Sequence, residues 1–227
     1  MPRIYKLSRT GLKLIYKIRH HRGHGVHSPF VFNLINKVIE EKTPYYAYKD
    51  IASYLHVSHG ISYRKKKFNR LSFGLVNYFN VKLVMEIGSG YGFNTFFLTA
   101  PSSQIECICV EDDDEKRLFA GILSQGWNRK IELHKEIPAD INKKIDCLFI
   151  DLKAFSNITD KNINYFLNLL TEKSFIVVTA IRSNKHHAKV WKKIAGLDNR
   201  TAMLDLFNVG IVFFDKKLYR WDYKISY

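Results

Sequence analysis

The pattern of hydrophobic and polar positions changes near residue 81. Before it, apolar residues recur at helical spacing and predict helices over 29–41, 45–55 and 68–79. After it, short apolar runs alternate with amphipathic stretches, which is typical of parallel strands joined by helices. The predicted strands are 81–87, 105–110, 130–134, 145–150 and 174–180. The predicted helices between them lie near 94–100, 113–125, 159–170 and 184–195.

The last part of this pattern, residues 201–215, holds two apolar runs joined around Asn208. Such a pair predicts a tight antiparallel hairpin. We therefore expect an α/β fold with a mostly parallel, seven-stranded sheet that ends in an antiparallel hairpin. The expected division is a basic helical N-terminal extension over residues 1–80 and an α/β domain over 81–227.

A glycine-rich turn follows the first predicted strand. Gly88, Gly90 and Gly92 occupy alternate positions, and Glu86 precedes the first of them by two residues. Glycine is needed where φ is positive or where a ligand approaches the backbone closely. Dinucleotide sites use the spacing G-x-G-x-x-G, whereas this turn is G-x-G-x-G. The acid before it suits a positively charged ligand.

This turn resembles the first motif of the class I S-adenosylmethionine-dependent methyltransferases. In that family the acid and the glycines hold the amino-acid end of the sulfonium cofactor. The resemblance implies a Rossmann-like fold and a cofactor site formed by Glu86, Gly88, Ser89, Gly90 and Gly92. The order of the predicted elements agrees with the same fold.

An acid also ends the second predicted strand. Glu111 comes nineteen residues after Gly92 and is followed by Asp112. In nucleotide-binding α/β folds an acid at this place accepts hydrogen bonds from ribose hydroxyls. We predict that role for Glu111, with Asp112 as the second candidate. The alternative is that the acids over 112–114 only cap the next helix.

The family has a further site element, an acidic or polar residue after the third strand that contacts adenine, and this chain lacks its pattern. After the strand 130–134 the chain continues as Lys135-Glu136-Ile137-Pro138, without the Gly-Asp-Ala-like arrangement of the family. The residue that contacts adenine therefore stays unassigned.

The fourth predicted strand leads into Asp151. The segment resembles the Phe-Ile-Asp strand of the catechol-type O-methyltransferases, whose acid helps to bind a divalent metal. Those enzymes add an Asp-Asn pair after the fifth strand, whereas the corresponding stretch of this chain, residues 177–182 (VVTAIR), has no carboxylate. One acid is a poor site for a hard cation. We expect no metal ligands and predict that Asp151 faces the cofactor or the substrate, as a cofactor-binding residue and as the candidate catalytic residue. Lys153 and His134 are weaker catalytic alternatives.

Charge is concentrated in the N-terminal third. The net charge is +15, and residues 1–80 hold 15 lysines and arginines against three acids. A one-sided positive field favours anionic partners such as nucleic acid, acidic lipid or phosphorylated substrates. A solvated basic face is the alternative. The run Arg64–Lys67 is either a solvated helix start or an anion-binding edge close to the glycine turn.

The first 27 residues combine a basic amphipathic stretch (2–25) with His20, His21, His24 and His27. Such a stretch can lie on a membrane surface, on an RNA backbone or on the core. We expect it to pack on the core or on a second subunit, as in a homodimer. Glycines between the histidines break any helix that would align them, so we predict no metal site. The segment from His24 to Phe30, HGVHSPF, resembles a signature of small bacterial methyltransferase-like proteins, many of them from Bacteroidetes.

The composition favours a cytoplasmic protein. No stretch reaches the roughly 18 apolar residues that span a bilayer, and charges interrupt the N-terminus. Cys107, Cys109 and Cys147 lie in apolar runs without metal-type spacing, so we expect buried, reduced thiols.

Three functional hypotheses follow. The first is an S-adenosylmethionine-dependent methyltransferase with an unidentified acceptor. The second is a catalytically inactive methyltransferase-like domain that binds nucleic acid or an acidic partner. A dinucleotide-dependent oxidoreductase is the third, and the glycine spacing disfavours it.

Overall fold

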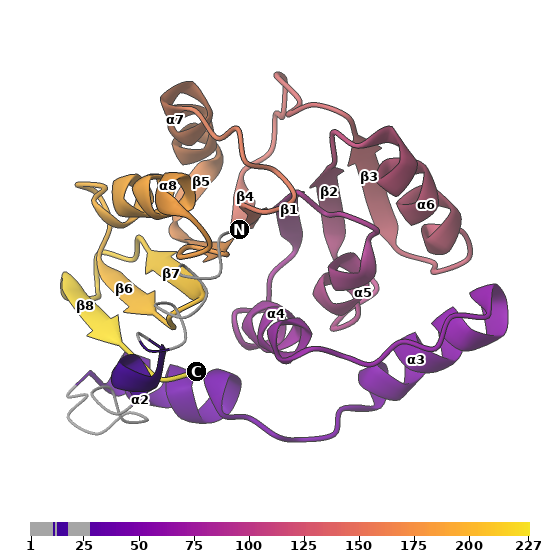
Figure 1. Cartoon of the computed structure of the whole chain (residues 1–227), viewed down its shortest axis with the longest axis horizontal. Helices are drawn as coiled ribbons and strands as arrows, with labels where there is room; N and C mark the ends of the chain where they lie inside the picture. Colours follow the sequence, from indigo (N-terminus) through magenta and orange to yellow (C-terminus); the bar gives the residue numbers. More distant parts are fainter. Residues whose placement is uncertain (1–10, 12, 18–27) are drawn as a thin grey trace.

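The computed structural model of the chain describes residues 11, 13–17 and 28–227 (Figure 1). Most of the predicted amphipathic stretch and the four N-terminal histidines lie outside these residues. No described helix combines the length and the apolar character that a bilayer span requires.

The N-terminal part is helical, as the spacing predicts. Its elements are α2 (Pro29–Leu34), the π-helix η1 (Ile35–Ile39), α3 (Tyr46–His59) and α4 (Lys67–Tyr78). Ser28 caps α2, since its side chain accepts a hydrogen bond from the Val31 amide, and Pro29 occupies the first turn. The predicted helix 29–41 is therefore an α-helical turn that continues as a π-helix.

The strands are β1 (Leu83–Ile87), β2 (Glu106–Val110), β3 (Lys130–His134), β4 (Ile145–Asp151), β5 (Leu170–Thr179), β6 (Ala202–Asp205), β7 (Val209–Phe213) and β8 (Trp221–Lys224). They form one sheet in the order β3-β2-β1-β4-β5-β7-β6-β8. The pairs among β1 to β5 are parallel, whereas β7 is antiparallel to both β5 and β6. The predicted parallel sheet with a terminal hairpin is confirmed.

The prediction of seven strands is wrong, because the sheet has eight. The additional strand, β8, pairs in parallel with β6. In this strand the Trp221 side chain is exposed and the Tyr223 side chain is half-buried. The buried Ile225 follows the strand. The hydrophobic pattern predicted no strand after residue 215. A homodimer stays a prediction.

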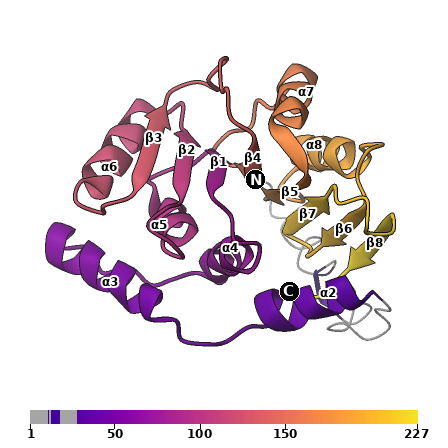
Figure 2. The ribbon, with the colours of Figure 1, turned by 180° about the vertical axis from the view of Figure 1, so that it is seen from behind.

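Helices cover both faces of the sheet (Figures 1 and 2). The connecting helices are α5 (Phe93–Thr99), α6 (Asp114–Ser124), α7 (Asp160–Leu169) and α8 (Lys185–Ala195). The elements α2, η1, α4 and α5 pack on one face, and α7 and α8 pack on the other. The strands β1 and β4 are neighbours whose connections leave in opposite directions. Ligands bind at the carboxyl ends of strands at such a switch point.

Candidate functional site

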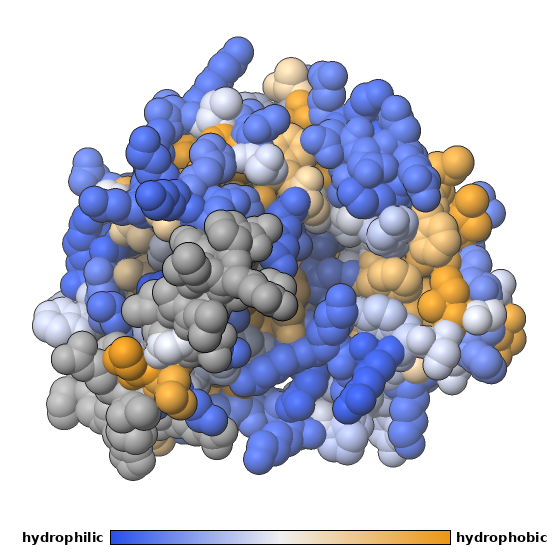
Figure 3. Space-filling model, in the orientation of Figure 1, coloured by the Kyte–Doolittle hydropathy of each residue, from blue (hydrophilic) through white to orange (hydrophobic). Residues whose placement is uncertain are grey.

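A cavity of about 620 Å³ opens at this switch point. Its walls come from the glycine turn after β1, the ends of β4 and β5, and the segment that leads into α4. The face drawn in Figure 3 is hollowed near its centre, and hydrophilic and hydrophobic side chains both border the hollow. The volume is in the range of small-molecule sites, about 300–1,000 Å³.

The glycine turn forms one wall of the cavity. Gly88 and Gly90 have φ values of 78° and 58°, in the left-handed region. A Cβ atom on Gly88 would lie 2.9 Å from the Asp151 carbonyl oxygen, so glycine is required there for close packing. A Cβ atom on Gly90 would meet nothing within 4 Å. Gly90 therefore leaves open space in the cavity wall, as a ligand cradle requires.

Glu86 contributes a buried carboxylate to the cavity. Its side chain is 4% exposed and accepts hydrogen bonds from Asn94 Nδ2 at 2.9 Å and Thr95 Oγ1 at 2.6 Å. Burial raises the pKa of Glu86 from its ordinary value of 4.5 to about 7, and the two hydrogen bonds oppose that shift. A cation bound beside this carboxylate would stabilise its ionised form.

A chain of partly buried hydrogen bonds joins Glu86 to the start of α4. Asn94 bonds Glu86, and its amide oxygen accepts a hydrogen bond from Asn69 Nδ2 at 3.1 Å. The Asn69 oxygen accepts from the Tyr63 hydroxyl and the Lys66 amide, both at 2.8 Å. The network fixes the segment that leads into α4 against the glycine turn. Sequence analysis missed Asn69 and Asn94, because no local pattern relates residues 25 positions apart.

Replacement of Asn69 by alanine should destabilise the protein and weaken ligand binding at the cavity. The change leaves the Tyr63 hydroxyl and the Asn94 amide without their partner, which costs about 1–3 kcal/mol of unfolding free energy. Urea unfolding monitors this cost, and titration with S-adenosylhomocysteine monitors the cavity. The matched control is Asn77→Ala on the exposed side of the same helix, with an expected effect below about 0.5 kcal/mol. Equal effects of both variants would show that the network has no role.

Glu111 lies at the other side of the turn. It is 1% exposed, and its Oε2 accepts a hydrogen bond from the Gly90 amide at 2.7 Å. Burial raises the pKa of Glu111, and amide donors, including that of Gly90, oppose the shift. Neither Glu111 nor the exposed Asp112 belongs to the described cavity lining. The structure thus brings Glu111 to the predicted turn and leaves Asp112 at the surface.

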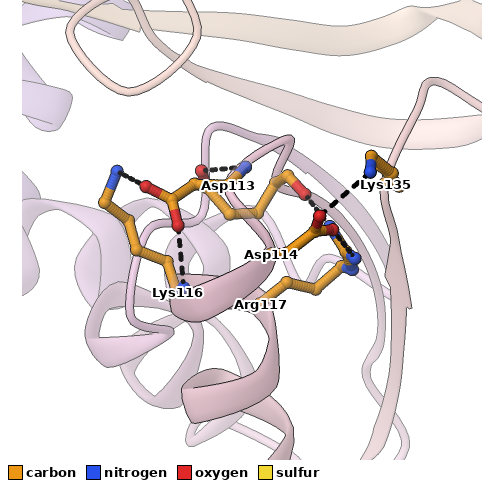
Figure 4. A network of polar contacts seen from close by, with 6 residues as sticks. Asp113, Asp114, Lys116, Arg117 and Lys135 are labelled. Atoms are coloured by element: carbon orange, nitrogen blue, oxygen red, sulfur yellow. Dashed lines mark hydrogen bonds and ion pairs between the residues drawn. The ribbon is translucent and has the colours of Figure 1, made fainter.

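The acids that follow Glu111 stabilise α6 (Figure 4). Asp113 caps the helix, since its carboxylate accepts the Lys116 amide at 3.1 Å. Asp114 pairs with Arg117 and with Lys135, the latter at 3.0 Å. The capping alternative therefore holds for Asp113, while Glu111 remains at the glycine turn.

Of the three remaining candidates, two line the cavity. Asp151 and Lys153 line it, and Asp151 Oδ1 accepts the Lys153 amide at 2.9 Å. Thr179 and Ser183 also line it, and their buried hydroxyls have no hydrogen-bond partner in the described part of the chain. His134 lies at the end of β3, outside the described lining. Sequence reasoning missed the two hydroxyl residues as site residues.

Three carboxylate or thiol groups lie close enough to share a metal ion. Glu86, Cys107 and Cys109 each place one ligand atom within 4.8 Å of the others. All three are buried, and the pKa of Cys107 is raised by its hydrogen bond to Cys109 and by burial. A protonated thiol is a poor metal ligand. Both cysteines belong to a hydrophobic cluster of buried residues, and we assign them to the core.

Comparisons with known proteins identify the fold. No protein-family model matches the chain, and no curated protein does. Among solved structures, the O-methyltransferase from Bacillus cereus in complex with SAH is 14% identical, with a TM-score of 0.54. The match covers 81% of this chain and 97% of that one.

Two further structures agree. An SAH-bound methyltransferase from Podospora anserina is 10% identical, with a TM-score of 0.58 over 82% of this chain and 96% of that one. The O-methyltransferase TomG from Streptomyces achromogenes, in complex with SAM, is 13% identical, with a TM-score of 0.52 over 76% and 91%. The chain therefore has the fold of the class I methyltransferases, with a cavity at the switch point of its sheet.

Proposed function

We propose that the protein is an S-adenosylmethionine-dependent methyltransferase. The observation that carries this proposal is the juxtaposition of open space at Gly90 with the buried carboxylate of Glu86 in one cavity. A cationic ligand with a polar, extended shape fits this combination. The fold that the chain shares with cofactor-bound methyltransferases supports it.

The residues present fit the cofactor. Glu86 would hold its ammonium group, and the turn Gly88–Gly92 would hold the rest of its amino-acid end. The Ser89 hydroxyl, which has no hydrogen-bond partner among the described residues, belongs to this turn. Glu111 and the exposed Asp112 beside it would accept the ribose hydroxyls. When bound, S-adenosylmethionine supplies an activated methyl group on a sulfonium. The chain itself then has to bind and orient an acceptor and to remove its proton.

Asp151 is the proposed proton acceptor. It lies on the same cavity as the glycine turn, and one of its carboxylate oxygens is oriented by the Lys153 amide. Thr179 and Ser183 offer buried hydroxyls that would hydrogen-bond a neutral polar group of the acceptor. We propose a metal-independent reaction in the cytoplasm, where the buried free cysteines stay reduced.

Calorimetric titration with S-adenosylmethionine and S-adenosylhomocysteine tests the proposal. Micromolar affinity for both, about −8 kcal/mol, is the expected result. Absence of heat and of thermal stabilisation at millimolar cofactor would overturn it. That result would favour the second hypothesis, a catalytically inactive methyltransferase-like domain that binds nucleic acid or an acidic partner.

Metal independence is tested by restoring the missing ligands. The double variant Thr179→Asp/Ala180→Asn places two oxygen ligands beside Asp151, and asparagine suits the φ of 61° at position 180. We expect Mn²⁺ binding, measured by electron paramagnetic resonance, in the double variant and no comparable binding in the natural chain. The control adds Asp151→Asn, which should remove the gain. Equally tight Mn²⁺ binding by the natural chain would contradict metal independence.

A further inference from the structure

A second cavity, of about 630 Å³, lies between the N-terminal helices and the C-terminal strands. It is as large as the cofactor cavity, and the proposed cofactor site does not use it. Its lining combines cationic side chains with aromatic rings. The cations are Lys13, Lys17, Lys42, Lys67 and Arg70, and the rings are Tyr16, Phe207 and Tyr227.

The charge balance of this cavity is positive. Five cations line it against two acids, Glu40 and Glu41. The Glu41 carboxylate already accepts hydrogen bonds from the amide and the hydroxyl of Thr43, at 2.6 and 2.5 Å, which lower its pKa. Within the described residues, no carboxylate forms an ion pair with Lys13 or Lys42. An anion would therefore meet uncompensated positive charge there.

Two of the cations are held in place by neighbours. The Arg70 guanidinium donates a hydrogen bond to the Glu41 carbonyl oxygen. The Lys67 ammonium lies 3.8 Å from the centre of the Tyr227 ring, and the Tyr227 hydroxyl donates to the Lys67 carbonyl at 2.7 Å. Fixed donors lose less conformational entropy when a ligand binds. This part of the cavity is preorganised for an anionic group.

The two cavities share two walls. At the start of α4, Lys66 lines the cofactor cavity and Lys67 lines the second one. In the turn between β6 and β7, Phe207 lines the second cavity and Asn208 lines the first. The guanidinium of Arg182 fixes this turn, since it binds the Phe207 carbonyl at 2.7 Å. The second cavity thus adjoins the end of the first that contains Thr179 and Ser183.

We propose that the second cavity binds a phosphate group of the methyl acceptor, while the reacting group of the acceptor lies near Asp151. This inference rests on the proposed function. Lysine and arginine are the usual partners of phosphate, and the arginine can bind two oxygens at once. The volume suits a phosphorylated small molecule. Lys66 and Lys67, at the end of the basic run Arg64–Lys67, then form an anion-binding edge between the cofactor and the acceptor.

The experiment titrates the full chain with inorganic pyrophosphate at low salt, by calorimetry. The test variant is Lys13→Gln/Lys42→Gln. The matched control is Lys189→Gln/Lys192→Gln, which removes the same charge from the exposed side of α8. We expect submillimolar binding by the natural chain, at least tenfold weaker binding by the test variant, and a change below twofold in the control. S-adenosylhomocysteine affinity should be the same in all three proteins.

Each result separates this inference from the proposed function. Absence of pyrophosphate binding, or equal weakening by both variants, would overturn the phosphate site while S-adenosylhomocysteine binding still supports the methyltransferase. Pyrophosphate binding without S-adenosylhomocysteine binding would overturn the proposed function, and with it the role of this cavity in methyl transfer. A single-stranded RNA that binds far more tightly than pyrophosphate, with both variants equally affected, would indicate an extended nucleic-acid surface and overturn the small-molecule acceptor.

Discussion

Replacement of Gly90 by leucine should abolish cofactor binding while the chain stays folded. The new side chain would start in open space, since a Cβ atom at this position meets nothing within 4 Å. It would fill the part of the cavity that the proposed cofactor needs. The left-handed φ of 58° adds a strain of about 1–2 kcal/mol. We expect at least a 100-fold loss of S-adenosylhomocysteine affinity, measured by calorimetry.

The matched control is Gly60→Leu. Gly60 has a φ of 66°, also has open space for a Cβ atom, and ends α3 outside the described cavity lining. The strain in the two variants is therefore similar, and urea unfolding should give similar losses of stability. Only the Gly90 variant should lose the ligand. Retained S-adenosylhomocysteine affinity in the Gly90 variant, or the same loss of affinity in both variants, would show that the turn has only a structural role.

Much of the fold could be predicted from the chain because its signals are local. Apolar runs of strand length and helical spacing predicted the parallel sheet and its terminal hairpin, and the structure confirms both. The strand β8 was missed for a physical reason. It is a short edge strand with an exposed Trp221, so its pattern does not differ from that of a polar tail. Its position depends on pairing with β6, which is not visible locally.

The candidate site likewise has residues that a local motif predicts and residues that only the folded structure brings together. The positions of Glu86, Gly90 and Glu111 follow from a motif within one βαβ unit. In the structure Glu86 and Gly90 line the cavity, and Glu111 accepts a hydrogen bond from the Gly90 amide. The polar network through Asn69 and the hydroxyl of Ser183 come from segments far apart in the chain. Their meeting depends on how the N-terminal helices and the β5–α8 loop pack at the switch point. Spacing in the sequence carries no signal for such contacts.

Cofactor affinity should rise with pH through the titration of Glu86. Its pKa of about 7 exceeds the ordinary value of 4.5 because the group is buried. Between these values the folded state binds more protons than the unfolded state, so this group lowers stability as pH rises toward 7. The ligand-free chain therefore contains a largely neutral Glu86 at pH 6 and a largely ionised one at pH 8. A cationic ligand favours the ionised form, so its binding at pH 6.5 should release protons.

Titration with S-adenosylhomocysteine from pH 6 to pH 8, in buffers of different ionisation enthalpy, measures both effects. Glu86→Gln should lower affinity about tenfold at pH 8 and abolish the pH dependence, because an amide carries no charge over this range. It should also remove the loss of stability between pH 5 and pH 7. Adenosine is the matched ligand control, since it lacks the amino-acid end and should bind with an affinity independent of pH. Affinity for S-adenosylhomocysteine that stays constant with pH, or a pH dependence that survives in Glu86→Gln, would place the ammonium group elsewhere. The acid before the glycine turn would then serve only to anchor Asn94 and Thr95.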